Sequence, residues 1–280
     1  MHGDDSVSTS LQPAYILHYR EFQESSFIVD AFTLRHGRIA LMAKSARASK
    51  PRTRALYQPF RPLLLSWVGG SDLRTLTGIE ESGQPLTLLD VPLACGYYFN
   101  ELILRLLGKD QPQPEIFAHY ALALSELVAP DVDIQIALRT FELQLLDTLG
   151  VLPDLAQSTS DGAVVDADRQ YRYHPANAVA VVTPRSAEDQ LASSTHYAIQ
   201  KEKVRTGEGD TRNPTVQADG ITADKGVLVS GATLLALSRL DLQEPAVLAE
   251  AKVLMRHILH VHLGDRPLKS RELFESLVRR

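Results

Sequence analysis

The pattern of apolar and polar positions changes along the chain from one typical of strands to one typical of helices. In the N-terminal part, short runs alternate between two sets of residues; in AYILHYR, for example, Tyr15, Leu17 and Tyr19 alternate with the other positions. This period of two indicates half-buried strands. The predicted strands cover residues 14–20, 27–34, 38–44, 61–68 and 73–81. Five short strands separated by turn signals predict a small antiparallel barrel of the OB-fold type.

After Pro85 and Pro92 the apolar spacing becomes that of amphipathic helices. The predicted helices cover residues 97–107, 115–128, 134–149, 230–240, 246–263 and 271–280. Asp133 and Ser270 precede two of them as N-caps, and Gly108 and Gly150 follow two of them as terminators. Their apolar stripes predict a helical bundle.

These patterns predict an α+β protein with two domains after a flexible N-terminus at residues 1–12. A five-stranded OB-fold barrel at residues 13–82 precedes a helical domain at residues 83–280. Within the helical domain, residues 156–226 are rich in small and polar residues and predict an irregular insertion. The runs GAVVDA and YRYHPANAVAVV, in Gly162–Val182, could pair there as a β-hairpin, and Thr183–Thr222 is predicted to be a mobile polar segment.

Charge distinguishes one segment, residues 35–61, which we call the basic segment. The net charge of the chain is −5, yet the basic segment contains eight Lys or Arg residues and no Asp or Glu. Between Lys44 and Arg54 the intervening residues are small and mostly polar, so we expect a flexible loop. In an OB-fold this segment would occupy the third strand and the loop after it, beside the face that binds nucleic acids. Lys and Arg bind phosphates there by releasing condensed counterions.

The alternative is a solvated loop that only keeps the protein soluble. Aromatic residues near the charge could stack on bases, and Tyr57, Phe60 and Trp67 are the candidates, although packing inside the barrel explains each of them alone better than stacking does. Tyr57 is preferred because it lies at the end of the loop. The predicted DNA-binding residues are Arg35, Arg38, Lys44, Arg47, Lys50, Arg52, Arg54 and Tyr57.

Several other classes of site lack support in the sequence. The single Cys95 excludes an internal disulfide framework and a four-cysteine zinc site. The histidines of HILHVH, His257, His260 and His262, are better explained as residues near a helix C-terminus than as metal ligands. The chain contains neither a phosphate-binding loop motif nor a Gly-x-Ser-x-Gly elbow, so we expect no enzymatic activity, cofactor or metal. The N-terminus does not resemble a signal peptide, and no apolar run reaches the ~18 residues of a membrane span, so a cytoplasmic protein is expected.

Five stretches of the chain resemble the RecO family of bacterial recombinational repair proteins. They are AYILHYREFQESSFIVDAFTLRHGRIALMAKSAR, ALYQPFRPLLLSW, GYYFNELILRLL, RTFELQLLDTLG followed by Leu152-Pro153, and LGDRPLKSRELF. The resemblance implies an N-terminal OB-fold, a helical domain and no known active site. It also implies binding of single- and double-stranded DNA, annealing of complementary strands, and a nucleoid-associated location in the cytoplasm. The implied partners are RecR, often RecF, and the acidic C-terminal tail of single-stranded DNA-binding protein, with RecA loaded indirectly.

The chain departs from one version of this family pattern. Many relatives have a four-cysteine zinc site after the third bundle helix, whereas this chain has Cys95 alone and therefore resembles the zinc-free branch. A second basic cluster near the C-terminus could bind the acidic tail beside apolar residues; its members are Lys252, Arg256, Arg266, Lys269 and Arg271. Two other functions remain open: a protein-interaction scaffold with a peptide-binding barrel, and a general single-stranded nucleic-acid-binding protein.

Overall fold

The computed structural model describes residues 8–70, 72–157, 162–176, 179–184 and 226–278. The chain packs as two units. The first comprises the residues up to Thr148 together with those from Leu263 onward, and the second comprises Leu149–His262. The expected boundary between residues 82 and 83 lies inside the first unit, because the barrel packs on the helices that follow it.

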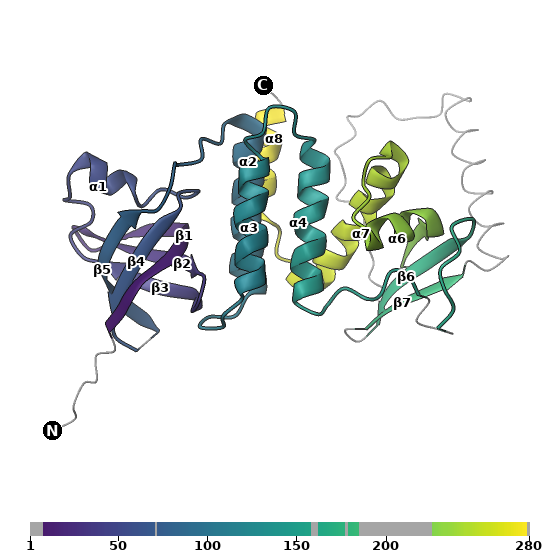
Figure 1. Ribbon diagram of the computed structural model, residues 1–280, viewed down its shortest axis with the longest axis horizontal. Helices are drawn as coiled ribbons and strands as arrows, with labels where there is room; N and C mark the ends of the chain where they lie inside the picture. The colour runs from purple at the N-terminus through teal and green to yellow at the C-terminus, as the bar shows by residue number, and fades with distance from the viewer. Residues whose placement is uncertain (1–7, 71, 158–161, 177–178, 185–225, 279–280) are drawn as a thin grey trace, which may run out of the picture. The chain divides into compact units, whose positions relative to one another are not determined.

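The predicted five-stranded barrel is confirmed (Figure 1). Its strands are β1 (Ser8–Phe22), β2 (Ser26–Thr33), β3 (Gly37–Ala43), β4 (Leu63–Val68) and β5 (Leu73–Glu81), closed in the order β1-β2-β3-β5-β4. Neighbouring strands are antiparallel except β3 and β5, which are parallel. β1 begins within the segment that was expected to be flexible: Ser8 pairs with Val68 and Gln12 with Leu65. Residues 1–7 of that segment lie outside the described residues.

Alternating burial along β3 and β4 places every second side chain inside the barrel, as the sequence pattern predicts. β2, however, is buried on both faces. Its Phe32 packs outward against Phe117 and Tyr120, with ring centroids 5.4 and 6.2 Å apart. Asn100 connects the same layers, since its amide donates to Leu17 O at 2.8 Å and its carbonyl accepts from the Tyr120 hydroxyl at 2.6 Å. The barrel is thus held against the helices by aromatic packing and a buried hydrogen-bond chain.

After the barrel, the first unit contains the helices α2 (Asp90–Leu106), α3 (Pro114–Glu126), α4 (Ile134–Thr148) and α8 (Lys269–Val278). α2 begins at Asp90 rather than at Tyr97 because Pro92 lies in its first turn, where a missing N–H is tolerated. Asp133 caps α4 as predicted and accepts from the backbone N–H groups of Gln135 and Ile136. On α4, Arg139 pairs with the buried Glu142 at 2.7 Å. The predicted helical bundle is therefore present.

In the residues that the structure describes, the second unit contains a three-stranded sheet with two helices. The strands are β6 (Gln170–Ala176), β7 (Val179–Pro184) and β8 (Val227–Ser230), in the order β7-β6-β8, and the helices are α6 (Gly231–Ser238) and α7 (Pro245–Leu263). The hairpin forms within the second of the two runs noted in the sequence, whereas GAVVDA contributes only an isolated bridge at Val164. Most of the expected polar insertion, residues 185–222, lies outside the described residues.

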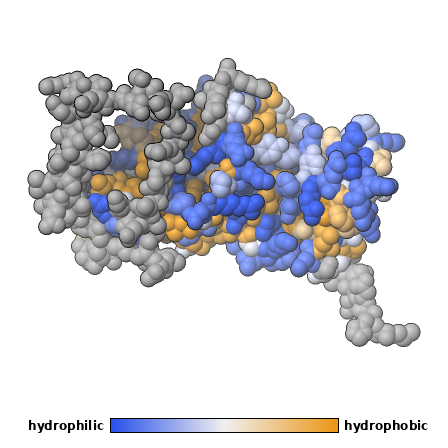
Figure 2. Space-filling model, turned by 180° about the vertical axis from the view of Figure 1, so that it is seen from behind, coloured by the Kyte–Doolittle hydropathy of each residue, from blue (hydrophilic) through white to orange (hydrophobic). Residues whose placement is uncertain are grey.

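The surface in Figure 2 shows hydrophilic and hydrophobic residues interspersed. Among the described residues, no helix is long and apolar enough to cross a membrane.

Candidate nucleic-acid interface

The segment after β3 is built from turns that are anchored to the barrel. β3 ends at Ala43, and Ser45 adopts a left-handed conformation with φ of 56°. Ala46 then enters the barrel core, and its carbonyl accepts from the Ser49 hydroxyl at 2.6 Å. The backbone N–H of Arg47 donates to Ser25 O at 2.8 Å, which connects the segment to the turn between β1 and β2.

A short helix, α1 (Pro51–Ala55), follows these turns and was not predicted. Pro51 occupies its first position, where the fixed φ of proline favours a helix. Tyr57 follows α1 and enters the same core as Ala46. The expectation of a flexible loop is therefore wrong for this structure: Ala46 and Tyr57 fix both ends of the segment, and α1 presents its polar side chains to solvent.

Five of the predicted DNA-binding cations are exposed: Arg35, Lys44, Lys50, Arg52 and Arg54. Lys44 follows β3 directly, whereas Arg35 lies in the turn before it. At about 3.3 Å per residue, the length of β3 separates those two side chains by more than 20 Å. Lys44, Lys50, Arg52 and Arg54 therefore form one candidate site at one end of the barrel, which we call the exposed quartet, and Arg35 belongs to the opposite end.

Arg38 and Arg47 are held by protein groups instead. Arg38 is half-buried, and its Nη1 donates to Leu104 O at 2.9 Å. Arg47 forms an ion pair with Glu21 at 3.0 Å and also donates to Gln23 O at 3.0 Å. Both guanidinium groups thus stabilise the barrel and its connections, and their capacity to bind phosphate is reduced accordingly.

The three aromatic residues considered for stacking are all buried. Tyr57 is 5% exposed, packs on Phe27 with ring centroids 5.4 Å apart, and has its pKa raised by burial. Phe60 and Trp67 are equally inaccessible. Tyr57 and Trp67 pack in the barrel core as that interpretation expects, whereas Phe60 packs on Tyr97 of α2 with ring centroids 5.1 Å apart. Tyr57 presents no ring face to a base in this conformation, and we omit it from the interface.

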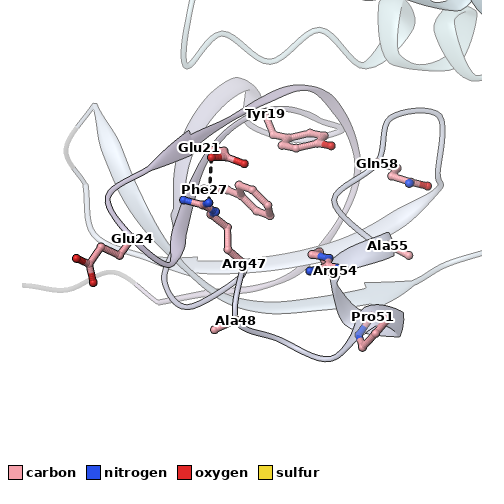
Figure 3. A pocket seen from close by; sticks show the side chains of 10 residues that line it. All are labelled: Tyr19, Glu21, Glu24, Phe27, Arg47, Ala48, Pro51, Arg54, Ala55 and Gln58. Atoms are coloured by element: carbon pink, nitrogen blue, oxygen red, sulfur yellow. Dashed lines mark ion pairs between the residues drawn. The ribbon is translucent and has the colours of Figure 1, made fainter.

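A hollow of about 600 Å³ adjoins the exposed quartet (Figure 3). It lies among the ends of β1 and β2, the turns after β3, and α1. Its lining consists of Tyr19, Glu21, Glu24, Phe27, Arg47, Ala48, Pro51, Arg54, Ala55 and Gln58. Arg54 is the only member of the exposed quartet that lines the hollow, so the hollow and the cationic surface meet at this residue.

Tyr19 is the aromatic side chain at this site that the sequence reasoning missed. It is 37% exposed, and its ring packs edge-on against Phe27 with centroids 5.1 Å apart. The alternation in the sequence had grouped Tyr19 with Tyr15 and Leu17, but a β-bulge between Ile16 and His18 shifts the register and leaves Tyr19 exposed while the other two are buried. The polar residues His18 and Arg20 fitted the alternation, so they gave no sign of this bulge.

The C-terminal basic cluster is divided between the two units. Lys252 and Arg256 lie on α7 in the second unit, and Arg266, Lys269 and Arg271 lie in the first; all five are exposed. The first turn of α8 is fixed by Glu101 of α2, whose carboxylate accepts from the backbone N–H groups of Lys269 and Ser270 at 3.0 and 2.9 Å.

One histidine of α7 is buried in the second unit. His257 is buried beside Tyr173, with ring centroids 6.0 Å apart, and burial lowers its pKa. Within the described ranges, no group of three or more His, Cys, Asp or Glu residues is arranged to hold a metal ion. Burial raises the pKa of the Cys95 thiol to about 12, so this cysteine is an unreactive core residue.

Comparison with known proteins gives consistent results for both halves of the chain. Residues 7–85 match the family model "Recombination protein O N terminal", and residues 91–201 match "Recombination protein O C terminal". Proteins named DNA repair protein RecO are similar over nearly their full length. The one from Nitrosococcus oceani is 38% identical over 269 residues, which cover 96% of this chain and 94% of the relative.

Two further relatives with the same name agree. The protein from Methylococcus capsulatus is 37% identical and the one from Haemophilus influenzae 35% identical, covering 98% and 96% of this chain and 96% and 97% of the relatives. The chain thus matches both family models, and it is 35–38% identical to these relatives over nearly its whole length. The chain belongs to the RecO (Recombination protein O) family.

Proposed function

We propose that this protein is a non-enzymatic mediator of DNA repair that binds single- and double-stranded DNA mainly through phosphate contacts. The observation that carries the proposal is the exposed quartet, four exposed cations on the segment that follows β3 of the barrel. Phosphates bind such a surface without regard to base sequence, so sequence preference is weak. Membership of a family whose relatives are named DNA repair proteins supports the repair role.

Annealing of complementary strands follows from the same electrostatics. Two DNA strands repel one another. Arg52 and Arg54 on α1, with Lys50 just before it, screen this repulsion while raising the local concentration of both strands. In this role the protein would promote recombinase (RecA) loading on DNA coated with single-stranded DNA-binding protein, together with RecR and RecF.

Charge reversal of one pair tests the DNA-binding proposal. Lys50 lies just before α1 and Arg54 lies four residues later, on α1; both are exposed. The double variant Lys50→Glu/Arg54→Glu should weaken binding to all DNA sequences. It should also flatten the salt dependence of single-strand binding by about 1.4 units of slope, at ~0.7 per phosphate contact. Fluorescence anisotropy of labelled oligonucleotides over a salt titration measures both quantities.

The chain offers a matched control with the same residues at the same spacing. Lys252 and Arg256 are also exposed and lie four residues apart on α7. The variant Lys252→Glu/Arg256→Glu should retain DNA affinity and salt slope. Equal effects of the two double variants, or none from the first, would refute the proposed interface.

The control variant also tests the partner proposal. We propose that the acidic tail of single-stranded DNA-binding protein binds the C-terminal basic cluster. In the first unit, exposed Lys269 and Arg271 are close in sequence to half-buried Leu273 and Phe274, and in the second unit Lys252 and Arg256 are exposed on α7. Cations with apolar neighbours suit an acidic peptide that carries apolar side chains. Lys252→Glu/Arg256→Glu should weaken binding of a tail peptide by isothermal titration, whereas Lys50→Glu/Arg54→Glu should leave it unchanged. If only Lys50→Glu/Arg54→Glu weakened binding of the tail peptide, the tail would bind at the barrel instead.

A further inference from the structure

The hollow beside the exposed quartet differs chemically from a phosphate site. Its charged lining consists of two carboxylates, Glu21 and Glu24, and two guanidinium groups, Arg47 and Arg54, so its formal charge is zero. A phosphate gains little electrostatic energy in a neutral hollow when exposed cations are available just outside it. A volume of about 600 Å³ lies within the range of sites that bind small organic groups. The hollow therefore suits an uncharged group with polar edges.

The aromatic part of the lining suits a flat group. Tyr19 lines the hollow and is partly exposed, and its edge-on contact with Phe27 fixes the direction of its ring. Figure 3 shows Tyr19 and Gln58 in different parts of the hollow, with Phe27 near Tyr19, and Phe27 is the more buried of the two rings. A second exposed tyrosine, Tyr97 of α2, lies close enough for the Tyr19 hydroxyl to raise its pKa, in addition to the larger effect of burial. Exposed aromatic rings beside a basic surface are the usual stacking platform for bases of single strands.

The polar side chains of the lining can form hydrogen bonds with the edge of a base. The Gln58 amide can donate and accept, the Glu21 carboxylate accepts, and the Arg54 guanidinium donates. Glu21 keeps accepting capacity beyond its ion pair with Arg47, because its side chain is 67% exposed. Bases present mixed donors and acceptors on their edges, and only unpaired bases expose both these edges and their ring faces.

We infer that this hollow takes one unpaired nucleobase of a DNA single strand, stacked on Tyr19, while the exposed quartet neutralises the phosphates on either side. The inference rests on the proposed function, because phosphate contacts with Lys50 and Arg54 bring the strand to the hollow. It adds a base-dependent contact, which double-stranded DNA cannot make, to the sequence-independent phosphate contacts.

The test compares strands that share phosphates but differ in bases. An oligothymidine strand, a fully abasic strand of the same length and a blunt duplex are titrated with the wild type, Tyr19→Ala and Tyr19→Phe. Tyr19→Ala should weaken binding of oligothymidine by about 5- to 150-fold, the range for one base–aromatic stack, and should leave the abasic strand and the duplex unchanged. Tyr19→Phe keeps the ring and should bind like the wild type.

A matched control lies one residue away on the same strand. His18 is exposed and its Nδ1 lies 3.8 Å from Asp30 on β2, and it does not line the hollow. His18→Ala should leave all three affinities unchanged. Thermal melting of each variant confirms folding, since Tyr19→Ala also removes the ring contact with Phe27.

Three results would overturn the inference. Tyr19→Ala could bind oligothymidine as tightly as the wild type, it could lose affinity equally for the abasic strand, or it could lose affinity only for the acidic tail peptide, which would make the hollow a peptide site. Each of these leaves phosphate binding by the exposed quartet intact. Failure of the proposed function is distinct, because Lys50→Glu/Arg54→Glu would then bind every strand like the wild type.

Discussion

Arg38 Nη1 donates a 2.9 Å hydrogen bond to the backbone carbonyl of Leu104, near the end of α2. The carbonyl of Arg38 in turn accepts from the backbone N–H of Asp110 at 2.9 Å, and Asp110 forms a 2.6 Å ion pair with Arg74 of β5. A residue that the sequence placed among the DNA-binding cations therefore joins the barrel to the helices.

Arg38→Ala should lower the free energy of unfolding by about 1.5–3 kcal/mol. It removes the hydrogen bond that the charged guanidinium group donates to the carbonyl of Leu104, which then loses this donor. Urea denaturation measures this loss. The salt slope of DNA binding by the folded variant should match that of the wild type. Lys44→Ala, in the exposed quartet, should give the opposite result, with stability unchanged and a flatter slope.

Two features require glycine at position 37: the conformation of its turn and the close approach of another part of the backbone. The sequence predicts a turn there, and Gly37 has the expected positive φ of 65°. In addition, a Cβ at this position would lie 1.8 Å from the carbonyl oxygen of Gln111, in the loop between α2 and α3.

Gly37→Ala should therefore destabilise the first unit by more than the ~1–2 kcal/mol of a left-handed conformation alone, since backbone must also move. Gly70→Ala is the control, because a Cβ there meets no heavy atom within 4 Å among the described residues and its φ is not in the left-handed region. Thermal melting of the two variants compares them. Equal melting temperatures would contradict the close approach to Gln111.

The sequence predicted the local elements well because each strand and helix depends mainly on its own residues. The alternation on β3 and β4 and the cap at Asp133 required no knowledge of distant parts of the chain. The misses have a different origin. β2 is buried on both faces because Phe32 meets α3, which follows it by more than 80 residues, and no pattern within β2 could show this.

The same limit applies to the candidate site. Charge alone could not separate Arg38 and Arg47, which bind protein carbonyls and a carboxylate, from the exposed quartet. The exposure of Tyr19 depends on a β-bulge, and the burial of Tyr57 depends on Phe27 from another strand. The charge pattern therefore indicated the correct segment of the chain. Which of its side chains are exposed depends on tertiary contacts that the sequence pattern does not show.

Glu101 holds the first turn of α8 in place. Its carboxylate accepts from the backbone N–H groups of Lys269 and Ser270 and from the Ser270 hydroxyl at 2.8 Å. A negative group at a helix N-terminus satisfies free N–H groups and interacts favourably with the helix dipole. Glu101→Gln should cost about 1–2 kcal/mol locally and so speed hydrogen exchange of the α8 amides by about 5- to 30-fold.

Hydrogen–deuterium exchange with mass spectrometry of the peptide that contains α8 measures this change. Glu80→Gln on β5, an exposed glutamate, provides the matched substitution and should leave α8 exchange unchanged. If α8 exchanged at the same rate in both variants, the capping role of Glu101 would be excluded. Loss of tail-peptide binding in Glu101→Gln would further place α8 in the partner site.

We expect His257 to make the second unit sensitive to acid. The side chain is 1% exposed, and burial, followed by the nearby His260 and His174, lowers its pKa. Because the pKa is lower in the folded state, the unfolded chain binds an extra proton once the pH falls below the ordinary histidine value of about 6.5. The free energy of unfolding should therefore fall as the pH is lowered from 7.5 through 6.5 towards 5.

His257→Gln, which cannot be protonated, should reduce this dependence, and His18→Gln, which replaces an exposed histidine, should preserve it. Urea denaturation at several pH values measures the slope, and an unchanged slope in His257→Gln would show that another group is responsible.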